Sequence, residues 1–216
     1  MNDRDLELSV NDELSWDPKI DATAIAVAAN DGTVTLRGTV GSFRQKVEAK
    51  RAAERVYGVK KVDNALRVRL LNESRKEDTE LRADVLRALM LDSVVPPTID
   101  AKVEDGLVTL TGTADWKFQR DEAESQAGNV LGVLGLVDEV ALVYPKPDAD
   151  EVEHAIEGAF KRNAKLDAED LSVRTSDGTV TLEGIVSSWS EHDEAVAAAW
   201  ASPGVTKVKD HIVVEY

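Results

Sequence analysis

The side chains of this chain that could bind a ligand are cations, and they are concentrated in one segment. Residues 43–61 read as a helix followed by a turn, and the cations of this segment are Arg44, Lys46, Lys50, Arg51, Arg55, Lys60 and Lys61. Lys46 and Lys50 are one helical turn apart, as are Arg51 and Arg55. Cations at this spacing could contact lipid phosphates, and each would contribute about 1 kcal/mol of binding free energy near an anionic surface. In the alternative interpretation, they form a solvated helix face and balance acidic neighbours within the chain.

Aromatic residues stand at the entry to this helix and to two later segments of the same kind, as Phe43, Trp116 and Trp189. A tryptophan at a loop tip can anchor in a lipid interface. The same residues could instead act as hydrophobic staples or pack between neighbouring parts of the chain. Their exposure in the fold would distinguish these alternatives.

The charge of the chain is unevenly distributed along its 216 residues, and the formal net charge is -15. Residues 3–70 have 12 Lys and Arg and 11 Asp and Glu, residues 78–144 have 5 and 13, and residues 148–216 have 6 and 15. The first segment is therefore nearly neutral, whereas the other two are strongly acidic. Because acidic surfaces repel phosphate backbones, we predict no nucleic-acid binding, and only the first segment could attract an anion over a distance.

The sequence contains no recognisable pattern of catalytic or metal-binding residues. There is no Cys, and the three His residues all lie in the last third of the chain, as His154, His192 and His211. Ser188, Glu191 and His192 are close in sequence, but a helix-capping segment explains them more simply than a catalytic group does. We therefore predict a protein that is not an enzyme and has no metal site or cofactor. A monovalent ion held by backbone carbonyls would leave no trace in the sequence.

Three copies of one unit organise the chain. Each copy contains Gly-x-Val-Thr-Leu-x-Gly, at residues 32–38, 106–112 and 178–184, and a Gly-Val pair follows the second Gly after 20 residues, at Gly58, Gly132 and Gly204. Fixed spacing with drifting side chains is typical of a repeated structural unit.

Each copy also predicts the same order of elements. An Asp-Gly pair between alternating apolar residues predicts a hairpin with a tight turn, as at Asp31-Gly32. Small residues four apart, such as Ala49 and Ala53, then predict a helix packed on the sheet and ending at Gly58. A third alternating segment predicts a strand parallel to the second. An amphipathic helix precedes each hairpin, marked by Leu6, Val10 and Leu14, by Leu81, Val85 and Leu89, and by Val152, Ile156 and Phe160.

The predicted fold class is therefore α+β. We expect three tandem αββαβ units, each a small three-stranded mixed sheet with two helices packed on it. The units are expected at residues 3–71, 78–144 and 148–216, with short linkers between them.

The Val-Thr-Leu-x-Gly core and the segment Gly58–Val62 resemble the BON domain family (bacterial OsmY and nodulation). The resemblance covers nearly the whole chain, as three tandem BON domains. Departures are Leu136, where the other copies have Val, and position 64, where Asn becomes Asp138 and Asp210; we expect these in the core and in a turn. The resemblance implies a non-enzymatic module linked to envelope maintenance, to osmotic or general stress, and to attachment to phospholipid.

Two functional hypotheses follow. In the first, the first unit contacts anionic phospholipid through Arg44, Lys46, Lys50, Arg51 and Arg55, and the other units face water or a protein partner. In the second, the chain is a cytoplasmic scaffold that binds proteins or responds to ions, since the resemblance implies a potassium-binding type. No segment is apolar enough to span a membrane and the N-terminus lacks an export signal, so we expect a cytoplasmic protein, or a periplasmic one if an upstream signal was removed.

Overall fold

A computed structural model of the chain describes residues 2–70, 76–143, 149–163, 166 and 170–215. The expected unit boundaries at Leu71, Tyr144, Asp148 and Tyr216 lie outside the described residues. The chain forms two compact units. One contains the residues up to Thr113 together with Gln119–Ala141, and the other contains Ala114–Phe118 together with Leu142–Tyr216.

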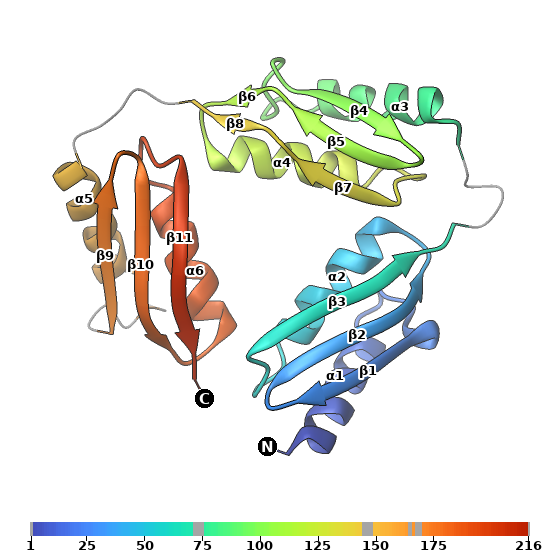
Figure 1. Ribbon diagram of the computed structural model, residues 1–216, viewed down its shortest axis with the longest axis horizontal. Coiled ribbons are helices and arrows are strands. Elements are labelled where there is room, and N and C mark those ends of the chain that lie inside the picture. The colour runs from blue at the N-terminus through green and yellow to red at the C-terminus, as the bar shows by residue number, and fades with distance from the viewer. Residues whose placement is uncertain (1, 71–75, 144–148, 164–165, 167–169, 216) are drawn as a thin grey trace. The chain divides into compact units, whose positions relative to one another are not determined.

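The first repeat has the order helix, strand, strand, helix, strand (Figure 1). Its elements are α1 (Asp3–Trp16), β1 (Ile25–Asn30), β2 (Thr33–Val40), α2 (Phe43–Glu54) and β3 (Lys61–Val68). Strand β2 is central, because it pairs antiparallel with β1 and parallel with β3. The predicted hairpin and parallel crossover are thus confirmed.

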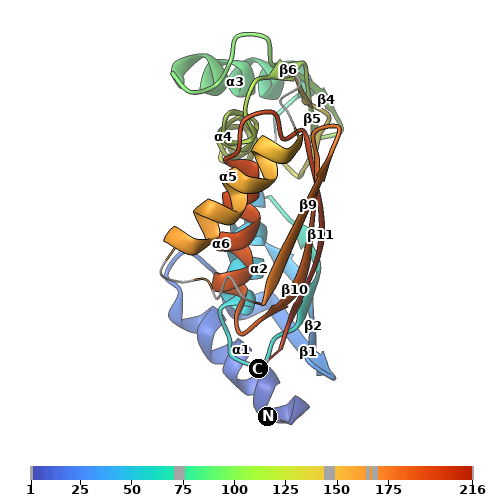
Figure 2. The same ribbon diagram turned by 90° about the vertical axis from the view of Figure 1, so that its left-hand side faces the viewer.

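The third repeat has the same topology. Its elements are α5 (Ala149–Arg162), β9 (Leu171–Ser176), β10 (Thr179–Val186), α6 (Trp189–Trp200) and β11 (Lys207–Val214). Strand β10 is central between antiparallel β9 and parallel β11. Figure 2 shows α5 and α6 on the same side of this sheet, so its other face is free of its own helices.

The second repeat differs in that two of its strands are interrupted. Its elements are α3 (Asp78–Leu91), β4 (Asp100–Glu104), β5 (Leu107–Thr111), β6 (Thr113–Ala114), α4 (Lys117–Gly128), β7 (Gly135–Asp138) and β8 (Ala141–Leu142). The backbone N–H of Ala141 still donates to the carbonyl of Gly112 at 2.9 Å, which keeps the pieces in line. The predicted α+β class of tandem αββαβ units is confirmed.

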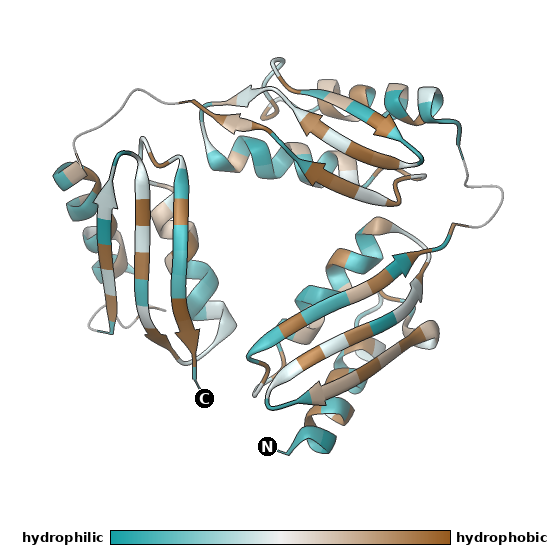
Figure 3. Ribbon diagram, viewed as in Figure 1, coloured by the Kyte–Doolittle hydropathy of each residue, from teal (hydrophilic) through white to brown (hydrophobic). Residues whose placement is uncertain are grey.

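Apolar residues at the expected spacing form the core of each repeat. In α1 the buried residues are Leu6, Val10 and Leu14, and the same positions are buried in α3 and α5. From the other side come the inward residues of the strands, such as Val34 and Leu36, which alternate with polar residues (Figure 3). Fully buried alanines, Ala49 and Ala53, let α2 lie close on the sheet.

The Asp-Gly turns have the geometry that their sequence predicts. Asp31 has φ of 48° and Gly32 has φ of 82°, as a two-residue hairpin turn with two positive φ values requires. The corresponding turns at Asp105 and Asp177 also have positive φ values. An acid from the preceding helix fastens the first turn, since Asp3 Oδ1 accepts a hydrogen bond from Asp31 N at 3.0 Å.

Two predictions of local structure are wrong. Helix α2 ends at Glu54, and Gly58 lies four residues later, in the turn that leads to β3. That turn is closed by short-range bonds such as Val59 N to Val56 O at 3.2 Å, and these compete with continuation of the helix. Position 64 does not lie in a turn, because Asn64 is within β3.

Candidate functional site

Helix α2 begins where its capping side chains are satisfied. Ser42 is the N-cap, and its hydroxyl accepts a hydrogen bond from Gln45 N at 3.2 Å. The Gln45 side chain accepts in turn from Gly41 N at 3.1 Å, so two unpaired N–H groups are satisfied reciprocally. Because Ala49 and Ala53 face the core, the cations of α2 lie on its outer and lateral surfaces.

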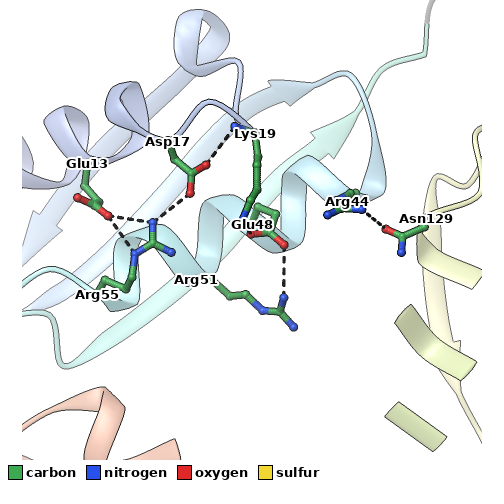
Figure 4. A network of polar contacts seen from close by, with 8 residues as sticks. All are labelled: Glu13, Asp17, Lys19, Arg44, Glu48, Arg51, Arg55 and Asn129. Carbon is green, nitrogen blue, oxygen red and sulfur yellow. Dashed lines mark hydrogen bonds and ion pairs between the residues drawn. The ribbon is translucent and has the colours of Figure 1, made fainter. Parts of the chain in front are cut away.

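Arg55 is held by two carboxylates of the first repeat, although its side chain is 49% exposed (Figure 4). Its Nε donates to Glu13 Oε1 at 3.0 Å and its Nη2 donates to Asp17 Oδ2 at 3.0 Å. Burial opposes the charge of Arg55, but the hydrogen bonds to Glu13 and Asp17 outweigh it and raise the pKa of the guanidinium. The pKa of Asp17 is lowered, first by the hydrogen bond from Lys19 N and then, against the effect of burial, by Arg55. Arg55 therefore ties the end of α1 to α2.

A buried carboxylate lies between two other cations of this region. Glu48 is 8% exposed, and it forms ion pairs with Arg51 Nη1 at 3.4 Å and with Lys19 Nζ at 3.5 Å (Figure 4). Lys50 forms an ion pair with Glu54 at 3.3 Å, one turn along the helix. Much of the positive charge of α2 is thus balanced locally.

Within the first compact unit, α2 and α4 enclose a cleft of about 360 Å³. Arg44 reaches across it, because its Nη1 donates to Asn129 Oδ1 at 3.1 Å. Arg51 lines the same side, and the acids Asp121 and Glu124 line the other. The cleft is therefore mixed in charge.

The remaining cations lie elsewhere in the first repeat. Lys46 is half-buried, and no carboxylate pairs with it among the described residues. Its carbonyl accepts a hydrogen bond from Asn64 Nδ2 at 2.7 Å. Lys60 is exposed beside the hairpin turn, and Lys61 forms an ion pair with Asp63 at 3.0 Å. The seven cations therefore do not form one continuous surface.

The three aromatic residues at the helix entries are all half-buried. A Cβ placed on Gly128 would come within 3.1 Å of the ring of Phe43, so this ring covers the end of α4. The Trp116 ring lies 6.4 Å from that of Phe118. The Trp189 ring meets His192 edge-on, with ring centroids 4.8 Å apart.

His192 has a set of contacts that the sequence reasoning missed. Its Nε2 lies 2.7 Å from Asp210 Oδ2 and its Nδ1 lies 3.0 Å from Asp193 Oδ1. Burial opposes the charged ring, yet the hydrogen bond to Asp193 and the attraction of Asp210 outweigh it and raise its pKa. The hydroxyl of Ser188 accepts from Glu191 N at 3.2 Å, which confirms this segment as a helix cap.

Two further properties concern the described residues as a set. In this part of the chain, no group of three or more His, Asp or Glu side chains is arranged to hold a metal ion. Across the same residues, every helix is too short or too polar to cross a bilayer.

The BON domain pattern matches residues 2–69, 77–144 and 148–216 of the chain. These matches cover nearly all of the sequence, and they agree with three αββαβ repeats. The chain therefore belongs to the BON domain family, as three tandem copies.

Individual proteins are similar to parts of the chain. Osmotically-inducible protein Y of Escherichia coli (strain K12) is 33% identical over 145 residues, which cover 65% of this chain and 72% of that protein. An uncharacterized protein of Anaplasma centrale is 29% identical over 130 residues, which cover 55% of this chain and 83% of that protein.

Solved structures of CdsD, a structural protein of the type III secretion system of Chlamydia trachomatis, align weakly with this chain. One is 17% identical, covers 98% of this chain and 92% of its own, and has a TM-score of 0.28. The other, of the C-terminal domain, is 16% identical with full coverage of both chains and the same TM-score.

Proposed function

We propose that this chain is a stress-related binding protein without catalytic activity, and that its first repeat contacts anionic phospholipid surfaces. Membership of the BON family supports the general class. The similarity to a protein named as osmotically inducible supports the association with osmotic stress. We further propose that residues 3–71, 78–144 and 148–216 act as three domains, which the three BON matches support.

The observation that carries the lipid proposal is the charge of α2 within an acidic chain. Arg44, Lys50 and Arg51 are exposed on this helix, and Lys46 adds a cation with no carboxylate partner among the described residues. Each such cation contributes about 1 kcal/mol near an anionic leaflet. At the positions of Lys50 and Arg51, the second repeat has Glu124 and Ser125 instead. Arg55 supports this surface, since its ion pairs hold α2 against α1.

The test is flotation of the intact chain with vesicles of phosphatidylcholine alone and of phosphatidylcholine mixed with phosphatidylglycerol, at low and high salt. We expect binding only to the anionic vesicles, and only at low salt, because salt screens exposed charges. Lys46→Glu with Lys50→Glu should weaken this binding without unfolding the chain.

If the wild-type chain binds neither vesicle, the lipid proposal is wrong. The second hypothesis, a scaffold that binds potassium or a protein, would then replace it. A higher melting temperature in potassium than in sodium would support the ion-binding form of that hypothesis.

A further inference from the structure

The open face of the first sheet carries three arginines that the α2 proposal does not use. Arg37 lies on β2, Arg67 lies on β3, and Arg69 continues β3 by one rung, since its N–H donates to Val40 O at 2.8 Å. Buried residues alternate with them, for example Leu36, so their side chains leave the sheet on the face opposite the core. We call these three residues the arginine face.

Strand register brings the three arginines together. Arg37 is opposite Ala65, and Thr39 is opposite Arg67, so Arg37 and Arg67 occupy diagonal positions on neighbouring strands. Diagonal neighbours are within reach of each other when their side chains are long. Arg67 and Arg69 are two residues apart on one strand and share its face. The arginine face is therefore one cluster at one end of the sheet.

Unlike Lys50 and Arg51 of α2, the three residues of the arginine face have no carboxylate among the described residues that balances their charge. None of its three side chains forms an ion pair within the described residues, and all three are exposed. The acid that shares the open face of β3 is Asp63, and Lys61 pairs with it. On α2, by contrast, Lys50 and Arg51 have carboxylate partners.

The surface around the arginine face is flat, because the neighbouring side chains are small. Ala26, Ala28 and Ala65 are exposed on the same open face, and their methyl groups do not rise above the sheet. Helices α1 and α2 lie on the other side of the sheet (Figure 2). Three guanidinium groups can therefore approach a planar surface together, and each can form paired hydrogen bonds with a phosphate.

A bilayer fits this surface better than a folded protein does. Protein interfaces depend on large anchors such as Trp and Tyr in pockets, whereas alanine and threonine surround these arginines. Nucleic acid is disfavoured by the net charge of -15. An anionic leaflet supplies phosphates in one plane and needs no pocket.

The arginine face is also specific to the first repeat. At the positions of Arg37, Arg67 and Arg69, the second repeat has Thr111, Ala141 and Val143, and the third repeat has Glu183, Val213 and Glu215. This cluster thus lies in the one repeat that has more cations than anions.

We infer that the arginine face is a docking surface for the anionic phospholipid bilayer, and that it is the stronger of two lipid contacts in the first repeat. This inference takes the identity of its partner, anionic phospholipid, from the proposed function. It places the contact on the opposite side of the sheet from α2. Each surface can bind in its own orientation, so each can be removed without the other.

Three variants of the full chain test the inference by flotation with phosphatidylcholine vesicles that contain phosphatidylglycerol. The first carries Arg37→Glu, Arg67→Glu and Arg69→Glu, and the second carries Lys46→Glu and Lys50→Glu. The third is a matched control on the open face of the third repeat, with Arg174→Glu, Lys207→Glu and Lys209→Glu. It changes the net charge by the same amount as the first variant. Unfolding curves of all variants show whether a loss of binding comes from a loss of the fold. A milder triple variant of the arginine face, Arg37→Gln, Arg67→Gln and Arg69→Gln, removes the charge without introducing acids.

We expect the arginine-face variant to lose at least tenfold in partition coefficient, the α2 variant to lose less, and the control to lose no more than threefold. Retained binding of the arginine-face variant, with loss in the α2 variant, overturns the inference and leaves the proposed function standing. An equal loss in the control also overturns it, because net charge would then explain the effect. Failure of the wild-type chain to bind overturns both.

Discussion

His192 Nε2 lies 2.7 Å from Asp210 Oδ2, and this contact joins α6 to β11 in the third repeat. The equivalent residues of the other two repeats also connect the second helix to the third strand. In the second repeat, Arg120 Nε lies 2.9 Å from Asp138 Oδ2. In the first, Asn64 replaces the acid and its amide donates to the carbonyl of Lys46 at 2.7 Å. The connection between the second helix and the third strand is thus kept, while its charge differs.

The histidine makes this connection dependent on pH in the third repeat. The folded pKa of His192 is raised above the ordinary value of 6.5. A group whose pKa is raised by folding stabilises the folded state fully below its unfolded pKa, and this stabilisation is lost as pH rises through the folded pKa. We expect the third repeat to lose stability as pH rises above 6.5. Denaturant unfolding over a series of pH values, with an NMR titration of His192, measures both quantities.

Two substitutions provide controls for this pH dependence. Asp210→Asn keeps an acceptor for Ile212 N, as Asn64 does for Leu66 N, but removes one of the two carboxylate charges that face His192 and leaves that of Asp193. It should lower the pKa of His192 and flatten the pH profile. Asp138→Asn is the matched control, because it changes the equivalent acid of the second repeat, which faces Arg120 and not His192, and it should leave the pH profile of the third repeat unchanged. An unchanged titration of His192 in Asp210→Asn would contradict the assignment.

Gly38 is required by the close approach of two backbone segments in the first repeat. Its φ is 122°, and a Cβ at this position would lie 2.0 Å from the carbonyl oxygen of Ala24. Gly38→Ala should therefore destabilise the first repeat by more than about 2 kcal/mol, since both strain and a backbone clash oppose it.

Gly41→Ala is a matched control for this prediction. Its added Cβ would meet only the end of the Gln45 side chain, at 3.8 Å. We expect this substitution to change the free energy of unfolding by no more than about 0.5 kcal/mol, as is usual for surface substitutions. Chemical denaturation of both variants gives the comparison, and equal midpoints would show that the strand relaxes around the new methyl group.

The elements of the fold could be predicted because their patterns are local. Helix α1 is indicated by Leu6, Val10 and Leu14, which recur at helical spacing, and the β1–β2 hairpin is indicated by Asp31-Gly32. Neither requires knowledge of distant residues. The predicted end of α2 at Gly58 is wrong, because a glycine in a following turn resembles a C-cap glycine in sequence.

The candidate site could be predicted less well from the sequence, because its electrostatics depend on residues that are far apart along the chain. The sequence predicts Arg55 in the lipid contact, whereas its partners Glu13 and Asp17 are 42 and 38 residues away in the chain. The sequence does contain one signal, because Arg120 and His192 occupy the same repeat position and each faces an acid at a second shared position, Asp138 or Asp210. The arginine face has no local pattern in the sequence, because its residues lie on two strands whose register only the fold gives.

Arg55 and Lys50 are equally exposed, at 49% and 50% of the side chain, but they differ in the partners that they hold. Arg55 bridges Glu13 and the buried Asp17, whereas Lys50 pairs along its own helix with Glu54. Arg55→Ala removes both hydrogen bonds to α1 and should lower the free energy of unfolding by on the order of 1 kcal/mol or more. Lys50→Ala should cost less than about 0.5 kcal/mol, as exposed helix pairs do.

The lipid measurement should show the opposite ranking for the two variants. Lys50→Ala removes an outward cation and should weaken binding to anionic vesicles at low salt, while its unfolding curve stays close to that of the wild type. Arg55→Lys is the decisive third variant, because a lysine keeps the charge but cannot hold two carboxylates with a planar fork. If Arg55→Lys is as stable as the wild type, charge alone explains the contact and the guanidinium geometry does not matter. A stability between those of the wild type and Arg55→Ala, with unchanged vesicle binding, is the result that a tie between α1 and α2 requires.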